Sequence, residues 1–202
     1  MAEGSGVRWL LVSGLGLVLL AVVGALLYGW WVRPAVPPPA AQVAVGGVTA
    51  RQAFTPAAEL AGQWQEDARL AAVSGRWSAA DMQVGGQVEW AFQFFSPVTQ
   101  RLALIAVAAG TARMVRESLS PYVVPTFSAA EWRVDSDRAL QAWWERGGKV
   151  LIARRPDAEL ALQLHVPGAG GQPVWTVVGL IAGTDTAFTV VVNATAGTLI
   201  EP

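Results

Sequence analysis

An uncharged run near the N-terminus constrains this chain more than any other feature. The 24 residues from Trp9 to Val32 carry no formal charge. A helix of that length spans about 36 Å at 1.5 Å per residue, which is enough to cross a hydrocarbon core of ~30 Å. The apolar regions of secretory signal peptides are shorter, about 7–15 residues. We therefore expect a retained single-pass transmembrane helix at 9–32 rather than a cleaved signal peptide.

The residues around this run bear on its orientation. Amphipathic rings favour the headgroup zone of a bilayer, and three gather at the C-terminal end: Tyr28, Trp30 and Trp31. Arg8 and Arg33 stand on opposite sides of the run, so the positive-inside rule decides little. A short tail at 1–8 before a large C-terminal part favours a cytoplasmic tail. The remainder of the chain is then expected outside the cytoplasm of a bacterial-type cell.

Small residues recur every four positions on one face of the expected helix, at Ala21, Ala25 and Gly29. This spacing lets another helix approach closely, so the face could dock onto a membrane partner. Alanine and glycine are also simply common in membrane helices. Both interpretations stay open.

A proline-rich linker is expected directly after the membrane helix, at 33–51. Its first part reads "RPAVPPPAAQ". Consecutive prolines favour an extended polyproline II spacer of about 3.1 Å per residue, which would hold the folded part roughly 20–30 Å from the membrane.

Composition excludes several classes of function. Charged residues make up only 14% of the chain and the net charge is −1. No basic stripe is present to neutralise phosphates, so a nucleic-acid partner is not expected. The absence of cysteine excludes disulfides, thiolate catalysis and cysteine-based metal sites.

The first part of the expected folded region combines a helix with a hairpin. Thr55–Gly75 has helical periodicity, with Thr55 as the cap, Pro56 in the first turn and Gly75 as the end. Apolar and polar residues then alternate over Gln87–Phe95, and a second apolar run covers Arg101–Ala109. The two runs predict an antiparallel hairpin with one covered face.

The same order recurs further along the chain. A helix is expected over Val134–Gly148, capped by Asp135 or Ser136. Strands are expected over four segments: Lys149–Arg154, Glu159–Val166, Pro173–Ile181 and Ala187–Glu201. The hairpins that begin at Trp90 and Trp175 match in layout. The predicted fold is therefore α+β, with two repeated helix-plus-antiparallel-sheet units at 52–118 and 134–202 joined by a connection at 119–133.

The final stretch "FTVVVNATAGTLIE" resembles the closing hairpin of PepSY domains, which ends in a strand, an Asp-Ala-x-Thr-Gly-like turn and a short return strand. Here Asn193 stands for the usual Asp, and Ala196–Gly197 stands for Thr-Gly. The resemblance implies a small helix-packed antiparallel sheet, extracytoplasmic and membrane-tethered, that binds proteins or inhibits proteases. Independently of the family, Asn can bond its own backbone and Gly197 can adopt a positive φ, so this turn is expected to be structural.

No catalytic constellation is evident. The single histidine, His165, falls on the polar face of an expected strand. One histidine without cysteine makes a transition-metal site improbable. The carboxylates at 134–137 are better explained as a helix cap than as an acid/base pair. We therefore predict no catalytic, cofactor-binding or metal-binding residues, and a protein that is not an enzyme.

Two tryptophans in connecting segments, Trp77 and Trp132, have two interpretations. Each ring either packs beneath a loop or stays exposed as an anchor for a protein partner. We keep both residues as candidates for partner contact.

Together these features predict a membrane-anchored, extracytoplasmic, non-enzymatic protein-binding module. It would be an accessory subunit of a membrane complex or a modulator of a protease. Its partner would be an integral membrane protein or an extracytoplasmic protein. The alternative is a small-ligand sensor or carrier that uses an apolar cleft between the two units. The sequence does not indicate an oligomeric state.

Overall fold

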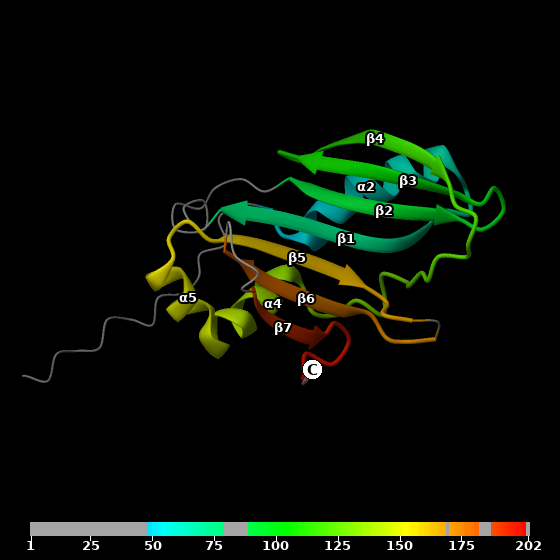
Figure 1. The fold of residues 1–202 in the computed structure, drawn as a ribbon. Coiled ribbons are helices and arrows are strands. Elements are labelled where there is room, and N and C mark those ends of the chain that lie inside the picture. The colour runs from blue at the N-terminus through cyan, green and yellow to red at the C-terminus, as the bar shows by residue number, and fades with distance from the viewer. Residues whose placement is uncertain (1–47, 79–88, 169, 182–186, 201–202) are drawn as a thin grey trace, which may run out of the picture. The chain divides into compact units, whose positions relative to one another are not determined.

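The computed structural model describes residues 48–78, 89–168, 170–181 and 187–200, all of which belong to one compact unit at 43–202. Its strands form one antiparallel sheet in the order β4-β3-β2-β1-β5-β6-β7-β8 (Figure 1). The strands are β1 Arg69–Ser78, β2 Trp90–Ser96, β3 Arg101–Ala108, β4 Thr111–Leu119, β5 Glu159–His165, β6 Val174–Leu180, β7 Ala187–Asn193 and β8 Leu199–Ile200. The helical segments are α2 Ala50–Trp64, α4 Ser136–Trp143, the π-helical turn η1 Trp144–Gly148 and α5 Lys149–Arg154.

The middle of the sheet overturns the predicted fold class. β1 and β5 pair antiparallel at every position from Ala72 opposite His165 to Ser78 opposite Glu159. The strands therefore make one continuous, mostly β domain, and the prediction of two repeated helix-plus-sheet units is wrong. Pairing between strands that are about 90 residues apart leaves no local signal in the sequence, so it could not be predicted. The pairing is favourable because it covers two sheet edges that would otherwise be exposed.

The structure does not support the predicted transmembrane helix. None of the described helices is long and apolar enough to cross a bilayer. The segment at 9–32, where the span was predicted, lies outside the described residues, as does most of the predicted linker at 33–51.

Helix α2 begins before the predicted position and ends sooner. Thr49 is its N-cap, and Thr49 and Gln52 form a reciprocal capping box. Thr55 is therefore not the cap, and Pro56 lies inside the helix. The predicted second half of this helix is strand β1 instead. The small alanines in the segment 68–72 fit a helical period, but the same segment also fits a half-buried strand. The buried face of α2 consists of four alanines: Ala50, Ala53, Ala57 and Ala61.

The second helical region begins where predicted, and its first helix is interrupted at the predicted end, but the segment after it differs from the prediction. Asp135 caps α4 and accepts the N–H of Ser136 at 2.7 Å. Gly147 adopts a non-helical φ of 143°, which interrupts the helix at its predicted end, and a second helical segment then follows. Lys149–Arg154 then forms α5, so the predicted strand there is wrong.

The predicted hairpin of β2 and β3 is confirmed, with Trp90 opposite Val107 and Ser96 opposite Arg101. Strand β4 was not predicted. Almost all of its side chains are exposed, so it lacks the alternation of apolar and polar residues that reveals a half-buried strand.

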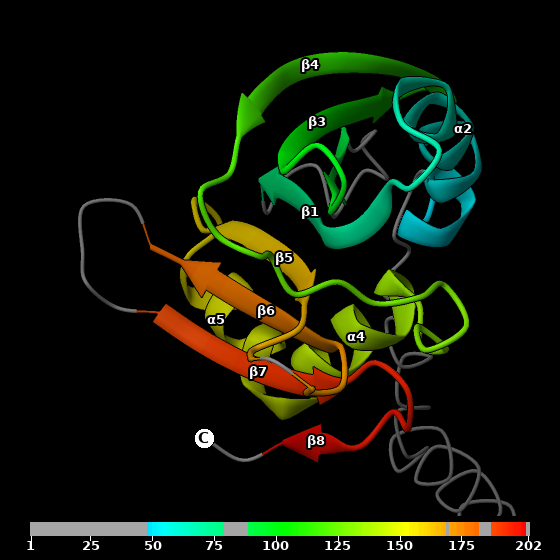
Figure 2. The same ribbon diagram turned by 90° about the vertical axis from the view of Figure 1, so that its right-hand side faces the viewer.

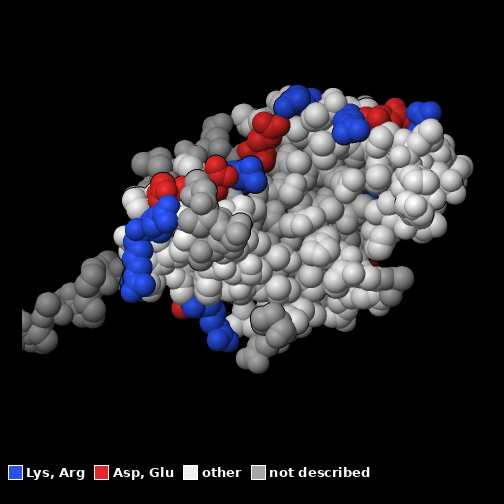
Figure 3. Space-filling model, in the orientation of Figure 1, with Lys and Arg blue, Asp and Glu red and all other residues white. Residues whose placement is uncertain are grey.

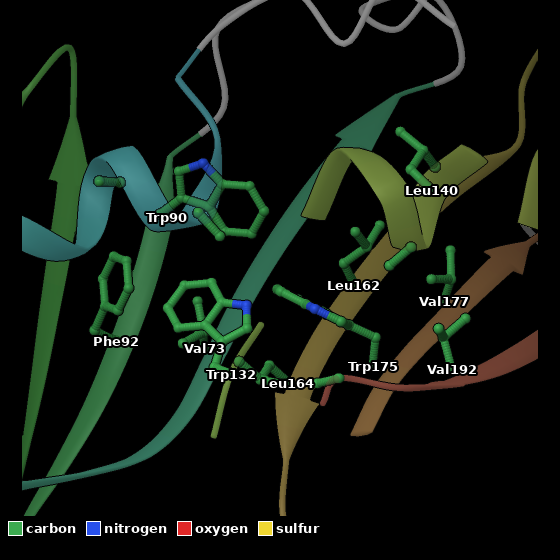
Figure 4. Packing of buried hydrophobic residues seen from close by; sticks show 14 of the residues in the cluster. Val73, Trp90, Phe92, Trp132, Leu140, Leu162, Leu164, Trp175, Val177 and Val192 are labelled. Atoms are coloured by element: carbon green, nitrogen blue, oxygen red, sulfur yellow. The ribbon is translucent and has the colours of Figure 1, made fainter. Parts of the chain in front are cut away.

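One core cluster joins both halves of the sheet, and α2 and α4 pack against the same face. Figure 4 shows Trp90, Trp132 and Trp175 close together in this core. Their rings contact one another edge to face, with centroids 6.5 Å apart for Trp90 and Trp175 and 5.9 Å apart for Trp132 and Trp175. Tryptophan therefore fills the space between the two helix-covered halves.

The turn after β7 behaves as predicted from its residues. The Asn193 side chain accepts the N–H groups of Thr195 and Ala196, both at 2.8 Å. Gly197 has a φ of 77°. The turn also braces the chain before α4, because Thr195 Oγ1 donates to the carbonyl of Glu131 at 2.6 Å.

Candidate functional site

Of the contact residues predicted from the sequence, the structure describes two, Trp77 and Trp132. Ala21, Ala25 and Gly29 lie outside the described residues. Trp77 is 4% exposed and Trp132 is 1% exposed. Both rings belong to the core cluster, and Trp77 lies within strand β1 rather than in a connecting segment.

Specific contacts hold these two rings in the core. Trp77 packs edge to face on Trp90, with ring centroids 5.3 Å apart. Trp132 donates from Nε1 to the carbonyl of Val134 at 2.8 Å, and the guanidinium of Arg51 lies 4.9 Å from its ring centroid. Trp175 donates to the same Val134 carbonyl. No local sequence pattern could have revealed this shared acceptor.

A rigid turn between β2 and β3 stands out as a functional candidate. The Asp67 carboxylate accepts the Ser96 hydroxyl at 2.7 Å and the N–H of Val98 at 2.8 Å. The backbone N–H of Val98 and the Ser96 hydroxyl hold the pKa of Asp67 below its ordinary value. Gln100 completes the turn with a φ of 49°, an uncommon conformation for a residue other than glycine. The charged carboxylate therefore stabilises a turn that presents Val98 to solvent.

Four large apolar side chains, each between 72% and 81% exposed, belong to this end of the sheet. We call them the apolar tip: Val98, Leu119, Tyr122 and Val123. Leu119 pairs with Arg101, the first residue after the turn, and Ser120 donates its N–H to Gln100 at 2.8 Å. The turn and the end of β4 are therefore adjacent.

The chain that follows β4 carries the rest of the tip. Figure 2 shows it leaving β4 and crossing the end of the sheet toward α4. The Ser120 hydroxyl donates to the carbonyl of Tyr122 at 2.8 Å. Pro121 and Pro125 stand on either side of Tyr122–Val124 and restrict the backbone there. In Figure 3 the corresponding end of the molecule, at the right, is largely uncharged below a band of charges along its upper edge.

A groove runs beside the tip, between α2, the start of β1 and the chain at 126–131. We call it the α2 groove, and its volume is about 560 Å³. Its apolar lining includes Phe54, Ala58, Gly62, Leu70, Phe94 and Phe127. Phe127 is fixed there because its N–H donates to the carbonyl of Leu70 at 2.9 Å.

Two opposite charges, Arg69 and Glu131, also line the α2 groove. The Glu131 carboxylate accepts the N–H of Ser128 at 2.7 Å, and this bond holds its pKa below the ordinary value. Among the described residues, Arg69 is in no ion pair. The groove therefore has a carboxylate engaged with backbone and a guanidinium that forms no ion pair in the described chain, although its charge also lowers the pKa of Asp67.

Two further sets of titratable side chains lie away from the tip and the groove, and their contacts are explained by the fold. His165 is half-buried on the sheet face opposite the core, and burial lowers its pKa. Arg155 and Asp157 form a two-bond pair near the end of α5. Within the ranges that the structure describes, no three acidic or histidine side chains come together as metal ligands.

The edge of the sheet at β4 is poorly suited to adding another strand. Val115 is an extra residue in the pairing with β3, so the strand is bulged. Arg113 and Glu117 form ion pairs with Glu89 and Arg101 along this edge. Bulges and charges are devices that keep sheet edges from pairing with other chains.

No family model and no curated protein sequence matches this chain. A solved structure with some likeness belongs to a protein of Clostridium difficile 630 that is described, provisionally, as a lipoprotein. The likeness has a TM-score of 0.45 at 8% identity and covers 73% of this chain and 90% of that protein. It assigns neither a function nor a location to this chain. The PepSY resemblance has no matching family model, and the tandem architecture predicted alongside it is not the one observed.

Proposed function

We propose that the described domain is a non-enzymatic protein-binding module that docks a second protein on its apolar tip. The observation that carries this proposal is the exposure of the four tip side chains, Val98, Leu119, Tyr122 and Val123, at one end of the sheet. Isolated apolar residues are normal on protein surfaces, but several large exposed ones at the same end of a sheet favour an interaction site. Tyrosine is also among the residues that contribute most to binding energy in interfaces.

The ordered backbone beneath the tip supports a role in binding. Asp67 holds the turn that carries Val98, and two prolines restrict the segment that carries Tyr122. A preordered surface loses less conformational entropy when a partner docks, so more of the contact energy appears as affinity. The pair of Arg101 and Glu117 beside the tip would lie at the polar rim of such an interface.

The carboxylates around this site have structural partners, which supports a role in binding rather than catalysis. Asp67 and Glu131 accept backbone N–H groups, and Asp135 caps α4.

The alternative of a ligand cleft between two units loses its basis in the structure. β1 and β5 join the halves in one sheet, and the tryptophans fill the core between the helices. The N-termini of the two helices also meet, because the Ser136 hydroxyl accepts the N–H of Ala50 at 3.1 Å.

The test is a paired capture experiment with the tagged full-length chain in its native cells. Val98→Asp and Tyr122→Asp each place a charge on the tip, whereas Val150→Asp places the same charge on α5, where the valine is 52% exposed. We expect one protein to be retained by the wild type and by Val150→Asp. Either tip variant should retain it roughly ten-fold less or worse, because a buried charge opposes docking.

Equal retention by all variants would overturn the proposal. Analytical sedimentation of the purified chain tests whether the tip instead binds a second copy of the same chain. A dimer that is present in the wild type and lost in Val98→Asp would assign the tip to a second copy of this chain, and it would also overturn binding of a different protein.

A further inference from the structure

The α2 groove contains open apolar space that the protein does not fill. A Cβ added at Gly62 would meet no atom within 4 Å. Phe54 and Phe94 stack beside this space with ring centroids 6.4 Å apart. Phe127 closes the other side, where its backbone is bonded to β1. The groove therefore offers aromatic walls around a volume that neighbouring side chains leave empty.

The size of the groove fits a small molecule. Its volume of about 560 Å³ lies within the range of roughly 300–1,000 Å³ typical of ligand pockets. A second hollow, lined by Phe188 and Ile200 near the opposite edge of the sheet, has only about 230 Å³. A ligand of drug-like size would be accommodated in the α2 groove and not in the smaller hollow.

The charges on its walls select the polar part of the ligand. The Glu131 carboxylate already accepts the backbone N–H of Ser128 at 2.7 Å. Arg69 also lines the groove and has no ion-pair partner among the described residues. A planar guanidinium binds carboxylates and other oxyanions through paired N–H donors. Arg69 is therefore the group of the lining that can pair with an anion.

We propose that the α2 groove binds a small molecule with an apolar, ring-bearing body and one anionic group. The body packs over Gly62 between the phenylalanine rings, and the anionic group pairs with Arg69. This site is separate from the apolar tip and does not depend on the function proposed for it.

The test measures binding of two fluorescent probes to the full-length chain. 1-Anilinonaphthalene-8-sulfonate has an aromatic body and one sulfonate, and N-phenyl-1-naphthylamine has nearly the same body without the charge. We expect the anionic probe to bind one site per chain. Arg69→Gln should weaken it roughly ten-fold, as for the loss of a charged hydrogen-bonded contact, and should leave the neutral probe unchanged.

A blocking series locates the site. Gly62→Phe adds a ring at a position where a Cβ meets no atom within 4 Å, and Gln63→Phe adds the same ring at an exposed neighbouring position of α2. We expect Gly62→Phe to abolish probe binding and Gln63→Phe to preserve it. Gly62→Leu provides a second blocking variant, and circular dichroism confirms that each variant is folded. Val98→Asp should leave probe binding intact, which separates this site from the tip.

Three results would overturn the proposal. The first is the absence of saturable probe binding by the wild type. The second is binding that survives both Gly62→Phe and Gly62→Leu in folded protein. The third is an equal effect of Arg69→Gln on the charged and the neutral probe, which would reject an anionic ligand.

Discussion

The two halves of the sheet are covered by helices in opposite ways. In the first half, α2 presents alanines and the strands supply the bulk, including Trp90 and Phe92. In the second half, α4 inserts the fully buried Trp143 and the strand supplies a glycine, Gly179. A Cβ on Gly179 would lie 2.6 Å from the Trp143 ring. The buried residues of α2 are therefore small, whereas α4 adds a large ring to a core that the strands of both halves also fill.

This difference explains where the molecule is open. Trp143 occupies the space against Gly148 and Gly179, so the second half is filled by its own helix. Helix α2 has small residues at Ala58 and Gly62 on its flank, and this leaves the α2 groove. The open groove and the apolar tip both adjoin the first half, which concentrates the candidate binding surfaces there.

The largest effect is expected in the filled half. Trp143→Ala should lower the free energy of unfolding by about 3–5 kcal/mol, because it leaves a large cavity and removes the bond from Nε1 to the Phe188 carbonyl. Trp144→Ala, at a half-buried neighbour, should cost much less. Chemical denaturation of both variants measures the difference, and equal losses would refute the assignment of Trp143 as the filling residue.

A smaller effect should distinguish two adjacent alanines of α2. Ala57 is fully buried against the sheet, whereas Ala58 lines the groove. Ala57→Leu should lower the free energy of unfolding by roughly 1–3 kcal/mol through overpacking. Ala58→Leu should leave it nearly unchanged, because its side chain can occupy the groove. A comparable loss in both variants would show that the groove is not open.

The turn that carries Val98 should loosen in acid. Because the folded pKa of Asp67 lies below its ordinary value of 3.8, its contribution is complete above that value and is lost as pH falls through the lower folded pKa. Amide exchange at Val98, corrected for its intrinsic pH dependence, should accelerate below pH 4. Asp67→Asn should exchange faster at neutral pH and lose this dependence. An unchanged Val98 amide in Asp67→Asn would contradict the role of the carboxylate.

The smallest effect is expected in the hairpin between β3 and β4. Ala109 and Gly110 have φ values of 49° and 78°, and a type I′ turn requires positive φ at both positions. Asparagine tolerates this conformation better than alanine, so Ala109→Asn should raise the free energy of unfolding by roughly 0.5–1 kcal/mol. Thermal unfolding measures the gain, and Ala109→Val should shift it the other way.

Local features of the fold could be predicted from the sequence, and distant pairings could not. Asp135 caps α4 and Asn193 bonds its own turn because both interactions are complete within a few residues. The pairing of β1 with β5 joins segments far apart in the chain, so two sheets were expected in place of one. Strand β4 escaped prediction because an exposed edge strand lacks alternating burial.

The candidate site could not be predicted because its residues are placed by contacts between segments that are distant in the sequence. The burial of Trp132 follows from its bond to Val134 and from Trp175, which is distant in sequence. The exposure of Val98 follows from Asp67, which lies about 30 residues away. The runs "SPVTQ" and "SPYVVP" place apolar residues among turn-forming prolines, and this signal could have suggested an exposed tip.

If the apolar tip meets a protein partner, a cross-linker placed there should capture that partner. Photo-cross-linking from a benzoylphenylalanine tests it directly, with the probe placed in the full-length chain at Tyr122 or, as the matched position in the second half, at Val150. Both side chains are exposed. We expect a discrete cross-linked protein from position 122 and none from position 150. The same adduct from both positions, or an adduct from position 150 alone, would contradict this expectation.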